Sequence, residues 1–484
     1  MNINVLIKRL EKENLIKDKY NHSFNIDYIS YNSKDIKNNT LFICKGMAFK
    51  EEYLDQAIES GATCYISEKD YKKNIPAIIV TDVTKAMAVA AKWFYEKYDS
   101  LTKIGITGTK GKTTTLNFIK NILKASGNNP AYFSTIDFYT GSNNGKSHNT
   151  TPEVIDIYRG LKDAKESGIK NLVMEVSSQA YKKNRVYGIN YDIGIFTNIG
   201  CDHISKNEHK DFEDYFSCKM GFIKNCKTVI LYKQIDHYDR IIKEIKDKKI
   251  ITYGVTKDCD YYINNIKPNG AITTFDITSR DKTRTFSIKM AGSFNVINAT
   301  SAIVVADQLN IDYESIKEGL YKTEVLGRMN TFNCGGVTVI VDYAHNYMSG
   351  KAFGEAIKNN FPDKNLKLVF GCPGDKGLNR RKEMASIANE YASFVYITME
   401  DPQSQNVSDI SEEIASYLKI PHTIINDRRK AIKTAIEEAN KDDVIGILGK
   451  GHENYQIING KYEDYETDVE VVKNISEKVL EGSK

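Results

Sequence analysis

The sequence predicts an α/β protein of three domains, and three observations lead to that prediction. Short apolar strands alternate along the chain with segments of helical periodicity. One of these strands, KIGITGT, runs into a glycine-rich turn and then into the helical pattern TTTLNFIKNILKAS. The length of 484 residues suits about three domains, because single hydrophobic cores rarely grow beyond about 250 residues.

Each predicted domain has its own series of strands. A small α/β domain is expected at residues 1–100, where TLFICKG and TCYISE flank the helical EEYLDQAIESGA. Residues 101–325 predict a central domain of the phosphate-loop type with a mainly parallel sheet, built from strands such as NLVMEVSS and DIGIFTNI. Residues 326–484 predict a Rossmann-like open sheet, with VTVIVDYA, LKLVFGCPG and DVIGILGKG as strands. Polar residues follow the strand ends, where open sheets bind ligands, so we expect one composite site.

Composition and charge exclude several classes of protein. Hydrophobic residues make up 41% and charged residues 27% of the chain, the balance of a soluble globular protein. No apolar run approaches the roughly 18 residues that span a bilayer, and the N-terminus lacks a secretory core. A cytoplasmic protein without membrane insertion is therefore expected. The net charge of +4 comes without a basic block, which disfavours nucleic acid as a partner. The eight cysteines form no CxxC pair and are expected to be reduced thiols.

The glycine-rich turn predicts a phosphate site. A standard loop, GxxxxGK[ST], would need glycine at the position of Ile106, so the register of GITGTKGKTTT is unusual. Its glycines still let the backbone wrap an anion at a helix N-terminus, while a lysine adds charge and a threonine offers a hydroxyl to Mg²⁺. The alternative is a turn capped by threonine. The expected phosphate-binding residues are Gly108, Thr109, Gly111, Lys112, Thr113 and Thr114.

Two further strand ends carry candidate metal ligands. Glu175 ends one strand, and Asp202 and His203 follow another. A carboxylate and an imidazole near a phosphate loop are groups that a second Mg²⁺ would use. Without more context, a loop histidine with a structural role remains the alternative for His203.

The motifs, taken in order, resemble the Mur ligases of peptidoglycan precursor synthesis. The loop of that family reads GTxGK[ST][ST], as GTKGKTT does here, which accounts for the unusual register. The resemblance covers essentially the whole chain through NTTP, EVSS, FTNIGCDH, YFSCK, GSFNVIN, GRM, VDYAH, FGCPGD and GKGHE. It implies an ATP-dependent ligase: ATP phosphorylates a carboxylate of a UDP-linked dipeptide, and an amine attacks the acyl phosphate. The amino-terminal pattern, TTP and GKGHE favour UDP-N-acetylmuramoyl-L-alanyl-D-glutamate over a folate as substrate.

The resemblance also implies roles for single residues. Lys112, Glu175, His203 and Lys219 match the catalytic set, and Thr113, Glu175, His203 and a carbamylated Lys219 match the Mg²⁺ ligands. From the residues alone, Lys219 would be a solvated lysine on a helix. The family's ATP contacts outside the loop match Asn295, Asn298, Arg328 and Asp342, and its UDP-substrate contacts match Ser33, Thr150, Thr151, Ser177 and Arg185. His345 either lies near the phosphates or caps a strand.

The match departs from the family at the acceptor amino acid, whose contacts correspond to Lys376, Asp401, Gln403, Gly449 and Glu453. Members that use meso-diaminopimelate carry DNPR, but this chain has EDPQ, so neutral Gln403 replaces an arginine. Lys376 replaces the arginine of a GDR motif, with Arg380 and Arg381 nearby. The acids of EDPQ offer negative charge to an ammonium. These changes favour L-lysine or a similar diamine over meso-diaminopimelate.

Two substitutions on the dipeptide side leave the exact UDP substrate open, because Gln179 and Lys183 stand where the family has histidine and glutamine. One alternative is therefore a Mur-family ligase for another acidic substrate. A second is a non-catalytic nucleotide-binding partner, against which the complete catalytic set argues. The loop register disfavours a mechanical ATPase. We expect a monomer.

Overall fold

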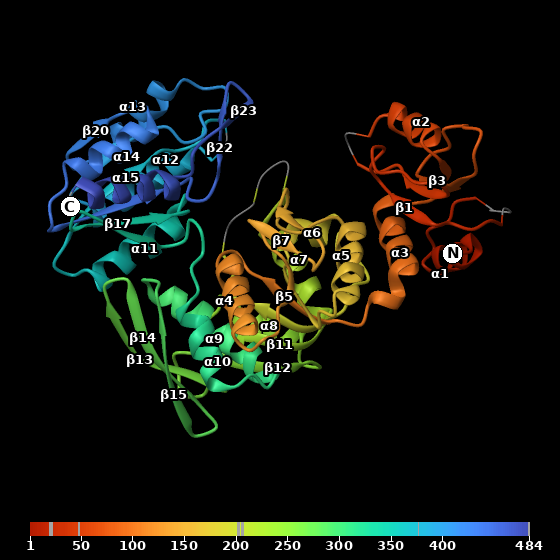
Figure 1. Cartoon of the computed structure of the whole chain (residues 1–484), viewed down its shortest axis with the longest axis horizontal. Helices are drawn as coiled ribbons and strands as arrows, with labels where there is room; N and C mark the ends of the chain where they lie inside the picture. The colour runs from red at the N-terminus through yellow and green to blue at the C-terminus, as the bar shows by residue number, and fades with distance from the viewer. Residues whose placement is uncertain (19–22, 47–48, 201–203, 205–207, 376, 483–484) are drawn as a thin grey trace. The chain divides into compact units, whose positions relative to one another are not determined.

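The computed structural model of the chain describes residues 1–18, 23–46, 49–200, 204, 208–375 and 377–482. The chain divides into two compact units, Met1–Thr252 and Tyr253–Lys484. Large, mainly parallel sheets flanked by helices recur along the chain, which confirms the predicted α/β class (Figure 1).

The first part of unit 1 is a four-stranded parallel sheet with the strands in chain order. Its helix α1 buries Ile3, Leu6, Ile7 and Leu10 at helical spacing against the sheet's core. The elements are α1 (Ile3–Lys12), β1 (Tyr28–Ser30), β2 (Thr40–Ile43), α2 (Glu51–Glu59), β3 (Ala62–Ser67), β4 (Ala77–Ile79), α3 (Val83–Tyr95) and η1 (Glu96–Tyr98).

The rest of unit 1 is built on a sheet with strand order β11-β10-β5-β9-β6-β7-β8, antiparallel only at β7 and β8. Its strands are β5 (Thr102–Thr107), β6 (Ala131–Phe133), β7 (Asp137–Tyr139), β8 (Asn144–Lys146), β9 (Asn171–Glu175), β10 (Tyr191–Phe196) and β11 (Cys226–Tyr232). Its helices are α4 (Lys112–Ala125), α5 (Val154–Glu166), α6 (Ser178–Lys182), α7 (Phe212–Lys224) and α8 (Tyr238–Glu244). Because β9, β5 and β10 are parallel neighbours, their carboxyl ends meet at one sheet edge.

Unit 2 begins with an antiparallel meander that the sequence analysis did not anticipate. Its strands β13 (Tyr261–Asn269), β14 (Ile272–Ser279) and β15 (Lys282–Ile288) follow β12 (Lys249–Gly254). Arg280 and Asp281 both have positive φ between β14 and β15, as a tight hairpin turn requires. Two helices complete this part, α9 (Ser293–Gln308) and α10 (Tyr313–Tyr321).

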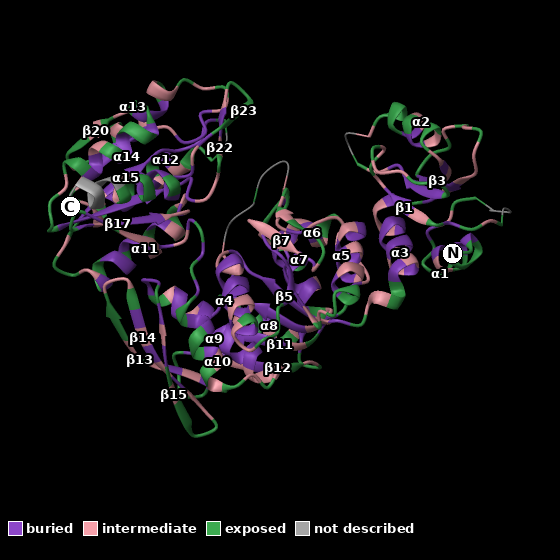
Figure 2. Ribbon diagram, viewed as in Figure 1, coloured by how far each residue is buried: buried purple, intermediate pink, exposed green. Residues whose placement is uncertain are grey.

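The second part of unit 2 is a six-stranded open sheet with strand order β16-β17-β21-β18-β19-β20, parallel except at β16. Its inner strands are largely buried, as Figure 2 shows for β17, whereas the edge strands β16 and β20 are mostly exposed or half-buried. The strands are β16 (Asn330–Cys334), β17 (Val337–Asp342), β18 (Asn365–Phe370), β19 (Phe394–Ile397), β20 (His422–Ile424) and β21 (Asp443–Leu448), followed by the hairpin β22 (Tyr455–Ile458) and β23 (Lys461–Asp464). The helices are α11 (Tyr347–Asn360), α12 (Asn379–Tyr391), α13 (Val407–Tyr417), α14 (Arg428–Glu437) and α15 (Asp468–Gly482).

A buried ion pair fixes the loop that follows β21. Arg428 Nη2 donates to Asp468 Oδ2 at 2.7 Å, and its Nε donates to Asp468 Oδ1 at 2.8 Å. The same guanidinium reaches Leu448 O at 2.7 Å, and Asp468 Oδ2 accepts from Gly451 N at 3.0 Å. Since the pair joins α14, α15 and the end of β21, it holds GKGHE against the sheet.

Replacing Asp468 by asparagine is expected to destabilise the protein by about 3–5 kcal/mol, because it leaves the Arg428 charge buried without its partner. Chemical denaturation of the two proteins measures this difference. The matched control is Glu437→Gln, which removes the exposed partner of Lys433 and should change stability by less than about 0.5 kcal/mol. Equal stability of Asp468→Asn and the parent would contradict the prediction.

Candidate active site

The loop between β5 and α4 has the backbone conformation that its glycines allow. Gly108 has a φ of 153° and Gly111, the residue before α4, a φ of 85°. A Cβ at Gly108 would lie 1.9 Å from Thr197 Oγ1, so only glycine fits there. Asn198 braces the loop, because its Oδ1 accepts from Lys110 N at 2.8 Å and its Nδ2 donates to Lys110 O at 3.0 Å.

Two lysines bring positive charge to this loop. Lys112 Nζ and Lys219 Nζ each donate to the Gly108 carbonyl oxygen at 2.9 Å. Lys219 is 2% exposed and lies over the ring of Tyr215, whose hydroxyl contacts Thr109 Oγ1 at 2.8 Å. The solvated lysine expected from the residues alone is therefore wrong for Lys219. Two ammonium groups beside a helix N-terminus have the charge that an anion such as phosphate would need.

Glu175 lies at the end of β9 beside the loop and is completely buried. Its carboxylate accepts from Thr135 N at 2.7 Å and from Thr135 Oγ1 at 3.0 Å. Burial raises the pKa of the Glu175 carboxyl, while Lys112 and hydrogen bonds from Thr135 and Thr113 oppose the rise. A buried carboxylate beside a threonine hydroxyl in the first turn of α4 fits a hard cation such as Mg²⁺.

Three predicted residues lie outside the described residues, namely the candidate metal ligands Asp202 and His203 and Lys376 of the acceptor set. Most of the other predicted residues lie at strand ends, in the loops that follow them or in the first turns of helices, but Lys219 lies within α7 and Arg185 follows α6. Thr114 is buried in the first turn of α4 behind Thr113.

The NTTP and EVSS motifs meet next to Glu175. Thr151 Oγ1 donates to Glu175 O at 2.9 Å and accepts from Ser177 N at 3.1 Å. Thr135 Oγ1 lies 3.2 Å from Thr150 Oγ1. Arg185 Nη1 donates to Thr151 O at 3.1 Å, which places its guanidinium beside the same motif. Four of the five residues assigned to the UDP substrate are therefore clustered.

The remaining one, Ser33, lies in the turn after β1, where its hydroxyl donates to Gln56 Oε1 at 3.1 Å. Ser177 has a structural task as well, because its Oγ accepts from Ala180 N at 3.1 Å and so caps α6.

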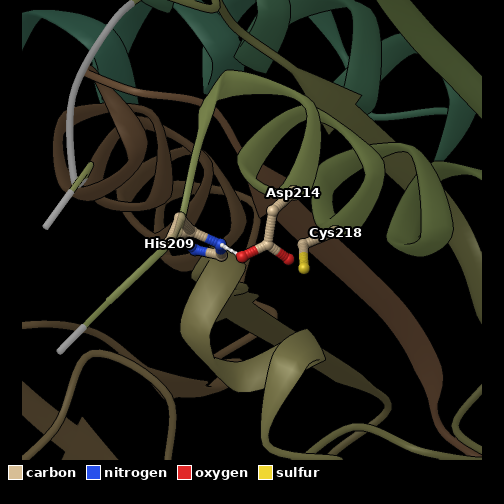
Figure 3. Close-up of side chains that lie close together, drawn as sticks. All are labelled: His209, Asp214 and Cys218. Atoms are coloured by element: carbon tan, nitrogen blue, oxygen red, sulfur yellow. Dashed lines mark hydrogen bonds and ion pairs between the residues drawn. The ribbon is translucent and has the colours of Figure 1, made fainter. Parts of the chain in front are cut away.

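A histidine that the sequence analysis missed supports this cluster. His209 is buried, with Nε2 2.9 Å from Ser178 Oγ and Nδ1 3.2 Å from Asp214 Oδ2. Figure 3 shows His209 facing Asp214, with Cys218 one turn further along α7. These three residues could supply metal ligands, but both ring nitrogens have partners and Lys182 Nζ lies 2.5 Å from the same carboxylate oxygen. The arrangement is therefore a brace between α6 and α7.

The nucleotide residues assigned to unit 2 lie at two places. Asn295 and Asn298 are buried in the first turns of α9, and Asn295 Nδ2 donates to Ala291 O at 2.8 Å. Asp342 ends β17 and accepts from Met329 N at 2.9 Å. The Arg328 guanidinium lies 4.4 Å from the centre of the Tyr343 ring.

His345 contacts the same tyrosine, with its ring 4.9 Å from that of Tyr343 and its Nδ1 2.8 Å from Tyr343 O. Since Tyr343 directly follows β17, this contact lies at the end of that strand.

The acceptor residues converge on Lys450, which is 1% exposed. Its Nζ lies 2.9 Å from Asp401 Oδ1 and 2.7 Å from Glu453 Oε2. Tyr343 donates to Glu453 Oε1 at 2.7 Å. Gln403 N donates to Ile457 O at 3.0 Å, which joins EDPQ to the hairpin β22–β23. Among the described atoms, the Gln403 Nε2 donor is buried without a hydrogen-bond partner.

Glu400 adds a third carboxylate to this buried cluster around Lys450. It is buried beside Gly449, where a Cβ would lie 2.9 Å from Glu400 Oε2. Burial raises the pKa of Glu400 to about 7; Arg428 and Lys450 lower it, and Asp401 and Glu453 raise it further. Three carboxylates thus face Lys450 and an arginine that Asp468 already neutralises. Asp401 and Glu453 together carry one more charge than Lys450, and ionisation of Glu400 adds a second excess negative charge to the cluster.

Comparison with known proteins adds independent findings. Two family models match, the Mur ligase middle domain at residues 106–306 and the Mur ligase glutamate ligase domain at residues 327–451. A Streptococcus thermophilus protein named UDP-N-acetylmuramoyl-L-alanyl-D-glutamate–L-lysine ligase is 38% identical, over 97% of this chain and 99% of its own. A Lactobacillus delbrueckii subsp. bulgaricus UDP-N-acetylmuramyl-tripeptide synthetase is 36% identical, with 93% of both chains covered.

Solved structures of similar fold include a UDP-N-acetylmuramoyl-L-alanyl-D-glutamate–2,6-diaminopimelate ligase. It superposes with a TM-score of 0.67 at 26% identity, covering 94% of this chain and 95% of the other.

The pKa of Glu400 predicts how stability depends on pH. The folded-state value of about 7 lies above the ordinary value of 4.5, so the native state holds this proton more tightly than the unfolded chain. The contribution of this carboxyl to the free energy of unfolding is present in full below the ordinary pKa. It falls by roughly 3 kcal/mol as the pH rises from that value to about 7. Glu400→Gln should lack the fall, and denaturation at about pH 5 and about pH 8 measures it.

The control for this titration is Glu412→Gln, an exposed position on α13. It should follow the parent at both pH values. If Glu400→Gln also follows the parent, the carboxyl titrates normally and the prediction is wrong.

Proposed function

Because the chain belongs to the Mur ligase family, we propose that this ATP-dependent amide ligase joins L-lysine to UDP-N-acetylmuramoyl-L-alanyl-D-glutamate. It would then be a MurE-type enzyme of peptidoglycan precursor synthesis. The single observation that carries the ligase function is the convergence of Lys112 and Lys219 on the Gly108 carbonyl beside buried Glu175.

The reaction proceeds in two steps. A carboxylate oxygen of the dipeptide attacks the γ-phosphorus of ATP, which gives an acyl phosphate and ADP. The uncharged amine of the acceptor then attacks the acyl carbon, phosphate leaves with the C–O electron pair, and the amine loses a proton as the amide forms. Positioning and charge neutralisation supply most of the catalysis in such phosphoryl transfers.

The residues of unit 1 take the phosphate side of this reaction. The loop N–H groups and Lys112 hold the transferred phosphate in place and neutralise its charge. Thr113, Glu175, His203 and, if carbamylated, Lys219 would hold Mg²⁺, which neutralises charge on the phosphate oxygens when bound. Unmodified Lys219 would itself contact the phosphates, since its ammonium already lies at the loop.

The dipeptide is assigned to Thr150, Thr151, Ser177 and Arg185. Their clustering next to Glu175 supports this assignment, because the reacting carboxylate has to approach the phosphate loop. Arginine suits a carboxylate because its planar fork can bind both oxygens. Ser33 would face the uridine part from the N-terminal domain.

The acceptor pocket supports lysine through its charge. Lys450 only partly offsets the Asp401, Glu453 and Glu400 carboxylates, so the side-chain ammonium of lysine completes the charge balance. Family members that use diaminopimelate have an arginine at the position of Gln403. In this chain, Gln403 offers an uncharged amide donor there instead. The relative with 38% identity is named an L-lysine ligase.

The remaining assignments concern ATP and organisation. Asn295, Asn298, Arg328 and Asp342 would contact ATP, and domain boundaries near residues 100 and 325 would separate the three functions.

A monomer in the cytoplasm is proposed. In the described part of the chain, every helix is too short or too polar to cross a membrane.

Phosphate release from ATP with Mg²⁺, UDP-N-acetylmuramoyl-L-alanyl-D-glutamate and a panel of amines tests the function. We expect kcat/KM for L-lysine to exceed that for meso-diaminopimelate by about tenfold or more. The reason is that neutral Gln403 cannot make the charge-assisted hydrogen bond to the distal carboxylate of meso-diaminopimelate, and one such bond is worth about tenfold or more. Gln403→Arg should narrow this ratio by raising turnover of meso-diaminopimelate. Gln403→Met, which adds no charge, should not.

Two other outcomes would each contradict a different part of the proposed function. A parent preference for meso-diaminopimelate would show that other residues recognise its distal carboxylate. If the protein binds ATP but releases no phosphate with any amine of the panel, the proposed substrate is wrong. The protein would then act on a different acidic substrate or have a non-catalytic role.

A further inference from the structure

Glu153 is an unusual residue for the N-terminal end of a helix. It is the N-cap residue of α5, a position where serine, threonine, aspartate and asparagine predominate because their side chains bond the first N–H groups. The Glu153 side chain makes no capping bond. Instead, one carboxylate oxygen pairs with Lys45 Nζ, and the other lies 2.9 Å from Arg185 Nε. All three side chains are 15% exposed or less.

These two cations come from different parts of unit 1. Lys45 follows β2 in the N-terminal domain, whereas Arg185 follows α6 at the cluster next to Glu175. A single carboxylate therefore joins the domain assigned to uridine and the arginine assigned to the dipeptide. Since both neighbours are cations, the carboxylate also reduces their mutual repulsion in a poorly solvated place.

The same side of α5 carries two more contacts to the N-terminal domain. Tyr31 OH donates to Asp156 Oδ2 at 2.5 Å. Arg159 Nη1 donates to Asp35 Oδ2 at 2.7 Å and its Nη2 donates to Ile29 O at 2.7 Å. Positions 153, 156 and 159 follow one another at a spacing of three, so they lie along one stripe of the helix. Helix α3 packs against α5 as well, and Figure 1 shows the two side by side.

We propose that Glu153 is a positioning residue that couples docking of the N-terminal domain to the orientation of Arg185. Because Lys45 and Arg185 share its carboxylate, Glu153 fixes the distance between the part of the protein that faces the uridine end of the substrate and the part that faces the dipeptide end. The substrate spans both places, and its affinity depends on that spacing. This inference rests on the proposed function, because it takes UDP-N-acetylmuramoyl-L-alanyl-D-glutamate as the ligand of Arg185.

The first test compares steady-state kinetics of Glu153→Gln with the parent protein. We expect KM for UDP-N-acetylmuramoyl-L-alanyl-D-glutamate to rise about tenfold or more, because the substitution breaks a poorly solvated ion pair and leaves the Arg185 charge without its partner. The KM values for ATP and L-lysine should stay within about twofold, since neither substrate contacts this stripe. Affinity for UDP alone, measured by calorimetry, should also be unchanged, because UDP engages only the N-terminal domain.

A double-mutant cycle tests the coupling. Lys45→Met should raise the same KM, and Lys45→Met combined with Glu153→Gln should be no worse than Glu153→Gln alone, because both changes break one linkage. The matched control is Glu166→Gln, which removes an exposed ion pair with Lys162 on α5 and should leave all constants unchanged.

Three outcomes would overturn the inference: an unchanged KM in Glu153→Gln, equal loss of affinity for UDP alone, or additive effects of the two substitutions. The parent protein separates these from failure of the proposed function. If the parent shows no turnover of the UDP-linked dipeptide, the proposed function fails. If the parent turns over and Glu153→Gln matches it, only the positioning role fails.

Discussion

The close packing of Gly108 is the constraint on which the rest of the site depends. No side chain fits between this residue and Thr197, so the loop lies directly on the end of β10. That placement brings the Gly108 carbonyl within reach of Lys112 from α4 and of Lys219 from α7. Two helices that are far apart in sequence therefore present ammonium groups at one point, and the parallel strands β9, β5 and β10 fix the distance between them.

Sequence alone predicted those parts of the fold that local patterns specify. Buried strands followed by glycine and threonine placed the loop between β5 and α4, and strand ends placed Glu175 and Asp342. The meander β13–β15 was missed, although Asn269–Gly270 and Arg280–Asp281 are turn signals that could have revealed it. The meander strands also alternate polar and apolar residues, unlike the apolar parallel strands of the same sheet, and that alternation is a second sign of antiparallel pairing.

Long-range pairing explains what else the sequence left open. The bond from His209 to Ser178 joins residues 31 positions apart, and neither motif contains a sign of the other. Lys219 is similar, because FEDYFSCKM has helical periodicity but does not show which face meets the phosphate loop. Burial of Lys219 and Glu400 depends on which element covers them. Residue types at strand ends were thus predictable, whereas their partners and protonation were not.

The two clusters differ in sign, and that difference matches the chemistry that we propose for each. Around Gly108, two ammonium groups lie beside a helix N-terminus, an arrangement that would suit the negative charge of phosphate oxygens. Around Lys450, carboxylates outnumber the available cation, and burial raises the pKa of Glu400 to about 7, so this carboxyl is about half protonated near pH 7. If this cluster receives the acceptor as we propose, a cationic ligand beside it favours the ionised form of Glu400, so binding and ionisation reinforce each other. An acceptor with a second carboxylate would oppose that ionisation, and the charge of the cluster would select against it even before any contact with Gln403.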